Sequence, residues 1–505
     1  MRFFIFITIL HIIMTIVEAN CGKIKGYTEN NLQIFKGIPY AEPPIGDLRF
    51  SPPQVKKTWS GVLEATEFGP CAFQGYTPLE DITGKIQPES EDCLTLNIWT
   101  PAIDNKKRPV MFWIHGGAFI MGGSRAPIYD GSELVRRGDV VIVTINYRLG
   151  AFGYLFIPGV TANVGQLDQI LALKWVHDNI AKFGGDPDNI TIFGESAGAY
   201  AVITLTAMPA AKGLFRRVIA QSMPTIDPKV TKKPTKDLMR ALGIKTGDIN
   251  ALRKVAPEEI IKAQNEITKQ GALEFRPLID VETFPVHPLT VFREGKCKNI
   301  DLMMGTNLHE AKLFTSMNPL TSKIKDEKAI MLYLGMMGIN SENARNIIDT
   351  YKKARSGILS NEPKELLDSI ITDLMFRVAT LQILEAQSKY QPNTYNYLFT
   401  WESSAFNGRF GACHALELPF VFNTLEEPGM KAFVANATNT ENLCENMMDA
   451  WLSFAHSGNP NHDGIPHWPT YDKKSRATLL FGKEFKIANA LFEKERRAWE
   501  GIMEI

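Results

Sequence analysis

The sequence predicts an α/β protein with a central, mostly parallel, twisted sheet, helices on both faces, and helical insertions over one sheet edge. Short apolar runs that suit buried strands recur along the chain, and amphipathic helical stretches separate them. This alternation is typical of a parallel sheet covered on both faces. The pentapeptide Gly194-Glu195-Ser196-Ala197-Gly198 lies between one such run and a helical run. The 505 residues contain no linker that would separate two domains, so we expect one large domain.

The first 19 residues differ from the rest of the chain. Arg2 precedes an almost wholly apolar run that ends near Val17, and Ala19 completes a small-residue cleavage pattern. We expect a signal peptide over residues 1–19 and a single mature domain over residues 20–505, secreted or in the periplasm or secretory lumen. A retained anchor is the alternative, since the run approaches the lower length limit of a membrane span. No later stretch is long enough to cross a bilayer, so we expect no stable membrane insertion after the signal is removed.

The composition excludes some classes of partner and cofactor. Lys+Arg and Asp+Glu are balanced at 55 each, which argues against a nucleic-acid partner. Neither a C-x-x-C motif nor a His/Cys cluster with metal spacing occurs, so we expect no metal site and no cofactor. Oligomeric state is left open.

Six cysteines suit an oxidising compartment, although their number does not determine their pairing. Cys71 and Cys93 bracket a loop rich in turn residues, and they are the pair we favour for a disulfide. Closing that loop would stabilise the fold by about 3 kcal/mol in the chain-entropy account. The pairing of the others stays open: Cys21, Cys297, Cys413 and Cys444.

Buried strands and the helices between them follow in order along the chain. After an edge-like stretch over 22–37, the expected strands are 94–99, 110–114, 140–146, 189–193, 217–220, 302–305 and 395–400. The expected helices are 166–183, 199–206, those within 326–389, and 441–457. Charged helical stretches over 225–270 are interpreted as an insertion over the edge where the strands end.

The pentapeptide around Ser196 fits a G-x-S-x-G nucleophile elbow. A strand-to-helix turn this tight requires small residues at 194 and 198, and it exposes the serine hydroxyl. By itself the motif is weak, because a chain this long contains it by chance roughly one time in ten at ordinary glycine content. The strand before it and the helix after it strengthen the prediction.

A second glycine-rich loop, His115-Gly116-Gly117-Ala118-Phe119, follows the strand at 110–114. Glycines let backbone N–H groups turn inward, and an oxyanion hole needs such donors about 3 Å from the developing charge. A simple chain reversal is the alternative, but the loop precedes the elbow as this architecture expects.

An activated serine also needs a base and a carboxylate that orients the base. His414 lies in a loop between a strand and an apolar run, whereas His456 lies on a packed helix and His462 and His467 in a surface turn. Glu310 follows the strand 302–305 by a short loop, on the same side as Ser196. The other acids considered, Asp280 and Asp301, lie before a turn and at the wrong end of a strand.

Together these residues resemble the type-B carboxylesterase/cholinesterase family. The match extends from the serine signature, 183–198, to the second signature, 91–97, and to 146–150, 305–310, 411–422 and 458–461. It covers essentially all of the chain after the leader.

The resemblance implies a single α/β-hydrolase domain with Ser196, Glu310 and His414 as the catalytic triad. It implies the N–H groups of Gly117, Ala118 and Ala197 as oxyanion donors, and Glu195 and Ser222 as supports of the triad. It also implies the Cys71–Cys93 disulfide and two structural ion pairs, Arg49 with Glu91 and Arg148 with Asp168.

The expected function is therefore a serine hydrolase that cleaves small-molecule carboxylic esters, with loss of activity as the histidine protonates near its ordinary pKa of about 6.5. Cholinesterases carry a tryptophan in the loop between the first two disulfide cysteines, and residues 72–92 contain none. A choline-specific esterase is thus not expected. A non-catalytic binding relative is the rival, because this fold can lose its chemistry.

Overall fold

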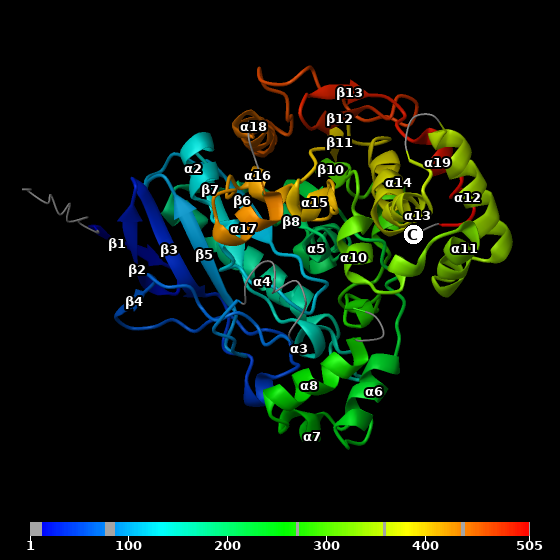
Figure 1. Ribbon diagram of the computed structural model, residues 1–505. Helices are drawn as coiled ribbons and strands as arrows, with labels where there is room; N and C mark the ends of the chain where they lie inside the picture. Colours follow the sequence, from blue (N-terminus) through cyan, green and yellow to red (C-terminus); the bar gives the residue numbers. More distant parts are fainter. Residues whose placement is uncertain (1–12, 76–85, 269–271, 357–359, 436–439, 504–505) are drawn as a thin grey trace, which may run out of the picture.

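The structure, a computed structural model, describes residues 13–75, 86–268, 272–356, 360–435 and 440–503. Within them, 13 strands join in one sheet of order β1-β2-β3-β5-β7-β6-β8-β9-β10-β11-β12-β13, and β4 pairs with β2 (Figure 1). The strands are β1 (Ile13–Ala19), β2 (Gly22–Glu29), β3 (Leu32–Pro39), β4 (Val62–Glu64), β5 (Thr95–Thr100), β6 (Arg108–Ile114), β7 (Val141–Ile145), β8 (Gly185–Glu195), β9 (Arg217–Gln221), β10 (Asp301–Asn307), β11 (Thr394–Phe399), β12 (Thr478–Phe481) and β13 (Lys486–Ala488).

The middle of the sheet, from β7 to β12, is parallel throughout. The outer strands pair antiparallel, except that β4 pairs parallel with β2. The seven strands expected from apolar runs are confirmed as β5 to β11. Strands β6, β7, β9, β10 and β11 are buried along their whole length. Strands covered on both faces need apolar side chains at successive positions. This explains why continuous apolar runs in the sequence predicted these strands correctly.

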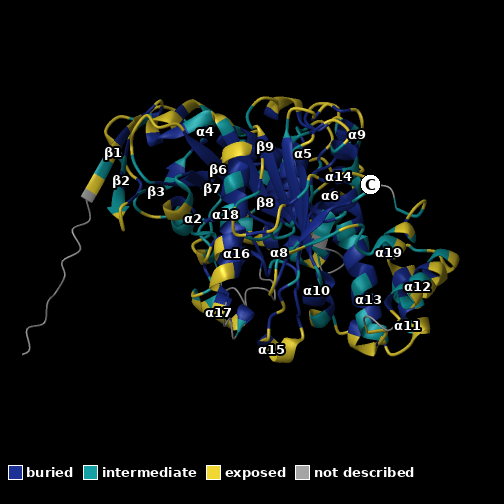
Figure 2. Cartoon of the chain, turned by 90° about the horizontal axis from the view of Figure 1, so that it is seen from above, coloured by how far each residue is buried: buried dark blue, intermediate teal, exposed yellow. Residues whose placement is uncertain are grey.

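Helices cover both faces of the sheet (Figure 2). The first face packs α4 (Val164–Asn179), α5 (Ala197–Leu205), α9 (Pro288–Arg293) and α14 (Val378–Gln387), and the second packs α2 (Ser132–Gly138), α16 (Leu418–Val421) and α18 (Glu441–Ser457). Neighbouring residues of one strand serve opposite cores: Phe112 and Ile192 lie in the first, Trp113 and Phe193 in the second. The alternation follows from the two-residue side-chain period of a strand.

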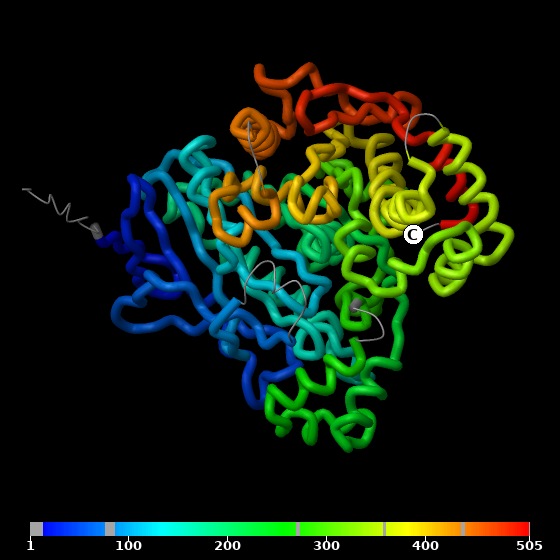
Figure 3. The backbone as a smooth tube through the Cα atoms, viewed as in Figure 1, coloured from blue at the N-terminus to red at the C-terminus, as the bar shows by residue number. Residues whose placement is uncertain are grey.

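Other helices extend these layers, and buried residues of the 225–270 region continue the first core. The insertion expected over 225–270 forms α6 (Lys233–Ala241), α7 (Ile249–Arg253) and α8 (Pro257–Thr268). A third apolar cluster unites α11 (Glu327–Met336), α12 (Ser341–Arg355) and α13 (Pro363–Thr372) with Trp499. Figure 3 shows the C-terminal segment with α19 (Glu493–Arg497), in red, returning beside these helices.

The end of the expected signal peptide belongs to the sheet. Strand β1 pairs antiparallel with β2 from Ile13 opposite Thr28 to Ala19 opposite Gly22, and Val17 and Ala19 are buried. Cleavage after Ala19 would therefore remove an edge strand. Residues 1–12 lie outside the described part, and export stays a prediction. None of the described helices is both long enough and apolar enough to span a bilayer.

The predicted Cys71–Cys93 disulfide is wrong for this structure, in which both residues are free, buried thiols. The Cys71 sulfur lies 3.3 Å from the carbonyl oxygens of Ile86 and Pro88 and donates to them. Burial, with the charge of Glu89 second, raises the pKa of Cys71 to about 11, and burial also raises the pKa of Cys93. Each thiol is thus held protonated in its own environment. The other four cysteines are also free.

Candidate active site

Ser196 stands in a strained turn between β8 and α5. Its backbone has φ +57° and ψ −123°, a region that non-glycine residues rarely adopt. Its N–H donates to the carbonyl of Gln221 on β9 (2.9 Å), and its own carbonyl accepts the N–H of Tyr200 (2.9 Å). The turn places the serine at the carboxyl end of the parallel strands, as a nucleophile elbow requires.

The two flanking glycines are required by close packing. A Cβ added at Gly194 would lie 2.6 Å from the carbonyl carbon of Gly198, and one at Gly198 would overlap the carbonyl oxygen of Ile114. Neither position tolerates a side chain without movement of the backbone. The steric expectation for the elbow is confirmed.

The structure brings Glu310 and His414 together from loops 104 residues apart. The Nδ1 atom of His414 lies 2.7 Å from Glu310 Oε2, and the other carboxylate oxygen accepts the N–H of Asn307 (2.7 Å). Glu310 is fully buried, and His414 is 4% exposed. The Glu310 acceptor favours the tautomer of neutral His414 that carries its proton on Nδ1. The Nε2 atom, which faces the elbow, is then free to accept a proton.

The Nε2 atom of His414 contacts Glu195, the residue before the nucleophile. It lies 3.0 Å from Glu195 Oε1 as an ion pair, without the alignment of a hydrogen bond. Among the described residues, no hydrogen bond joins the Ser196 hydroxyl to His414. The imidazole thus contacts Glu195 of the elbow and not the Ser196 hydroxyl itself. Catalytic hydrogen bonds are often long before substrate binds.

The electrostatics around His414 favour its protonated form. Burial alone would lower the pKa of the imidazole, but the carboxylates of Glu195 and Glu310 raise it well above its ordinary value. Burial raises the pKa of Glu195, His414 opposes that shift, and the charge of Glu310 adds to it. The expected pKa near 6.5 is therefore too low for this geometry.

A third buried acidic residue, Glu417, lies beside the predicted triad and was missed from the sequence. Its Oε1 accepts from the side-chain amide of Gln221 (3.0 Å) and its Oε2 from that of Asn307 (2.6 Å). Burial, followed by the charges of Glu195 and Glu310, raises the pKa of Glu417 to about 8. An acidic residue three positions after His414, at the start of an apolar run, was the available signal.

Asn307 links this carboxyl group to the loops of Glu310 and His414. Its amide also donates to the carbonyl of Cys413 (2.7 Å), next to the histidine, while its backbone N–H donates to Glu310. One residue therefore holds the loops of Glu310 and His414 together, the first through its backbone and the second through its side chain.

The loop expected to form the oxyanion hole packs against the elbow. A Cβ at Gly116 would lie 2.7 Å from the Glu195 carbonyl oxygen and 3.1 Å from Ser196 Cβ. Gly117 has φ +106° and Ala118 has φ +52°. Among the described backbone groups, the N–H groups of Gly117, Ala118 and Ala197 donate to no carbonyl. They remain available as donors.

The two remaining support residues differ. Glu195 contacts His414 directly, as described above. Ser222 follows β9 with φ +52°, and its N–H donates to the Gly305 carbonyl (2.8 Å). Its hydroxyl is buried and, in the described part of the chain, makes no hydrogen bond.

Both expected ion pairs are confirmed. Arg49 holds Glu91 through two hydrogen bonds of 2.6 and 2.5 Å, and Arg148 holds Asp168 through two of 2.8 and 2.6 Å. Asp168 also accepts the N–H of Arg148 (3.1 Å). No group of metal-binding side chains occurs within the described ranges.

Comparison with known proteins agrees with this geometry. The carboxylesterase family model matches residues 14–499. The chain belongs to the carboxylesterase family. It is 37% identical to a para-nitrobenzyl esterase of Bacillus subtilis (94% of this chain, 96% of that protein) and 34% identical to a phenmedipham hydrolase of Pseudarthrobacter oxydans (93% and 95%).

The fold is also that of solved relatives. A Geobacillus stearothermophilus carboxylesterase superposes with a TM-score of 0.86 at 37% identity (96% of this chain, 100% of that one), and a PNB esterase with 0.85 at 36% (96% and 99%). The predicted α/β-hydrolase fold is confirmed.

Proposed function

We propose that this protein hydrolyses carboxylic esters through a Ser-His-Glu triad and a covalent acyl-serine intermediate. The observation that supports it best is the hydrogen-bonded pair of His414 and Glu310, whose Nε2 edge faces the strained elbow of Ser196. Membership of the carboxylesterase family adds independent support.

In the proposed reaction, Ser196 Oγ attacks the ester carbonyl carbon while neutral His414 removes the hydroxyl proton. The N–H groups of Gly117, Ala118 and Ala197 stabilise the tetrahedral oxyanion. His414 then protonates the leaving alcohol, and the acyl group stays on Ser196. A water molecule, deprotonated by His414, repeats the attack and releases the acid, and Glu310 stabilises the imidazolium in both halves.

The test is hydrolysis of p-nitrophenyl esters from acetate to laurate, with Ser196→Ala measured alongside. We expect turnover that falls at least about 10⁴-fold in the variant, because removal of the nucleophile costs about that factor or more. Labelling with a fluorophosphonate gives a second measure. A folded wild-type protein that turns over no ester and takes no label would support the binding alternative instead.

The alcohol is proposed not to be choline, because residues 72–92 contain no tryptophan for a quaternary ammonium group. Comparing butyrylcholine with a neutral butyrate ester tests this point.

A further inference from the structure

A π-helical turn interrupts the helix beside the active site. The turn, Asp373–Arg377, joins helices α13 and α14 without a break in the helical backbone. Two of its carbonyls accept bonds from outside the helix: the N–H of Thr225 donates to Met375 (2.6 Å), and its hydroxyl donates to Leu374 (2.9 Å). Such turns add one residue to a helix and change the direction of the side chains that follow.

The turn directs Phe376 onto the catalytic histidine. The centroid of its ring lies 4.7 Å from that of the His414 imidazole, and the ring of Phe314 lies 5.1 Å from the same imidazole. The two phenyl rings are nearly parallel, with an interplanar angle of 14° and centroids 6.1 Å apart. Phe314 belongs to α10 (Ala311–Met317), which begins directly after Glu310.

The same turn is anchored to the acid loop. The hydroxyl of Thr372, just before the turn, accepts the N–H of Ala311 (3.1 Å). Within the turn, Arg377 forms an ion pair with Asp373 (2.7 Å). Thr372 therefore contacts the residue that follows Glu310, and Phe376 of the turn contacts the ring of His414.

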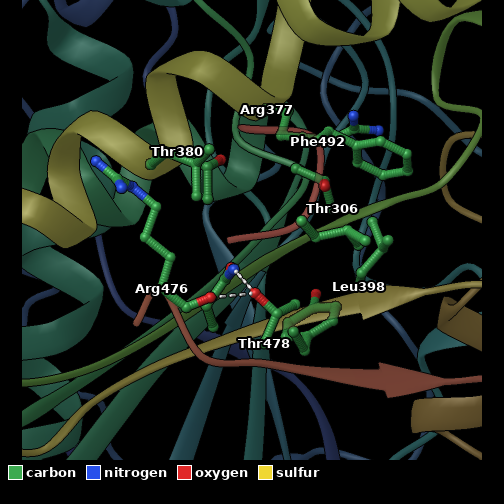
Figure 4. Close-up of a pocket in the computed structure, with 11 residues that line it drawn as sticks. Thr306, Arg377, Thr380, Leu398, Arg476, Thr478 and Phe492 are labelled. Carbon is green, nitrogen blue, oxygen red and sulfur yellow. Dashed lines mark hydrogen bonds between the residues drawn. The ribbon is translucent and has the colours of Figure 1, made fainter. Parts of the chain in front are cut away.

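The C-terminal segment holds the outer side of the turn. The Tyr351 hydroxyl donates to Asp373 and accepts the indole N–H of Trp499 (2.8 Å). The Arg377 guanidinium carbon lies 4.6 Å from the centroid of the Phe492 ring. Figure 4 labels both residues among those that line the adjoining pocket. Tyr351 and Trp499 are 1% exposed, so water does not compete for these hydrogen bonds.

We propose that the π-helical turn Asp373–Arg377 positions the catalytic histidine. Phe376, together with Phe314, restricts the imidazole of His414 so that Nδ1 stays on Glu310 while Nε2 faces the elbow. The hydrogen-bonded series Trp499–Tyr351–Asp373 fixes the turn from the C-terminal side. The inference rests on the proposed function, because a positioned base matters for catalysis by Ser196.

The first experiment replaces the two rings one at a time with Phe376→Leu and Phe314→Leu. We expect kcat for p-nitrophenyl acetate to fall about tenfold to a hundredfold, since a displacement of about 1 Å can cost a hundredfold. KM should change by less than about twofold. Phe376→Tyr keeps the aromatic face and should retain most of kcat.

The matched control is Phe35→Leu, a fully buried phenylalanine in β3 that packs on Phe183. It loses core packing but leaves the histidine untouched, so its kcat should equal that of the wild type. Equal kcat in Phe376→Leu and Phe35→Leu would overturn the inference.

The second experiment removes the remote anchor. Tyr351→Phe deletes the hydroxyl that joins Asp373 to Trp499 and changes little volume. We expect kcat to fall about threefold to tenfold, with KM unchanged. Wild-type kcat in this variant would show that the C-terminal segment does not hold the turn.

An NMR measurement separates this inference from the proposed function. The Cε1–H signal of His414, assigned with His414→Gln, should move in Phe376→Leu because a neighbouring ring is lost, and it should broaden as the imidazole gains freedom. It should be unaffected in Phe35→Leu. If the wild type hydrolyses no ester, the proposed function fails, and this signal still decides whether the turn positions the histidine.

Discussion

At the scale of single residues, the imidazole of His414 lies between two carboxylates. Glu310 holds Nδ1 and Glu195 contacts Nε2, and together they raise its pKa despite burial. A base must be neutral to accept the serine proton, so activity should appear only as the pH rises through this raised pKa. We therefore expect the acid limb of kcat/KM above 6.5.

Glu195→Gln tests that arrangement. Removing one negative charge beside Nε2 lowers the pKa of His414, so the acid limb of kcat/KM should move to lower pH. The measurement is a pH–rate profile with p-nitrophenyl acetate. Glu385→Gln, which removes a carboxylate paired with Arg476 outside the site, is the control and should leave the limb in place. An unchanged limb in Glu195→Gln would mean that this contact does not set the pKa.

At the scale of elements, β1 is an edge strand that overlaps the expected signal peptide. It adds a full ladder to β2 and buries Val17 and Ala19, and five strands separate it from β8, which ends just before Ser196.

A chain that begins at Asn20 should therefore be less stable than one that begins at Ile13. Loss of a buried valine alone costs about 1.5–3 kcal/mol, so we expect the free energy of unfolding to fall by at least about 2 kcal/mol. Urea unfolding of the two chains measures the difference, and kcat should be equal in both. Equal stability would show that β1 contributes nothing, and cleavage after Ala19 would then carry no cost.

At the scale of the whole molecule, the sheet separates two apolar cores, and a buried ion pair joins segments that also pack in the first core. Arg148 follows β7, Asp168 lies on α4, and the third guanidinium nitrogen of Arg148 donates to the carbonyl of Ser51 (2.7 Å). Asp168 is fully buried and Arg148 is 3% exposed.

Asp168→Asn should lower the free energy of unfolding by about 3–5 kcal/mol, because it leaves the buried Arg148 charge without its partner. Urea denaturation measures the loss. Asp178→Asn on the same helix is the matched control, since that carboxylate is exposed and a surface change stays within about 0.5 kcal/mol. Similar small losses in both variants would contradict a structural role for the pair.

The sequence by itself was sufficient for the local features of the fold and the site. Apolar runs predicted strands β5 to β11 because both sheet faces are covered, and the spacing around Ser196 predicted the elbow because only glycine fits at 194 and 198. Chain order relative to the strands placed Glu310 and His414 on one side of the sheet. These features depend on residues near one another in the chain.

The tertiary structure decided what depends on distant residues. Glu417 contacts the site through hydrogen bonds from Gln221 and Asn307. Phe376 contacts His414 from a π-helical turn that no local sequence pattern predicted. The sequence also predicted a disulfide where the structure has free thiols, and it did not predict the pairing of β1 with β2. Burial and hydrogen-bond partners come from segments far apart in the chain, and the same side chain in another environment would have another pKa and another role.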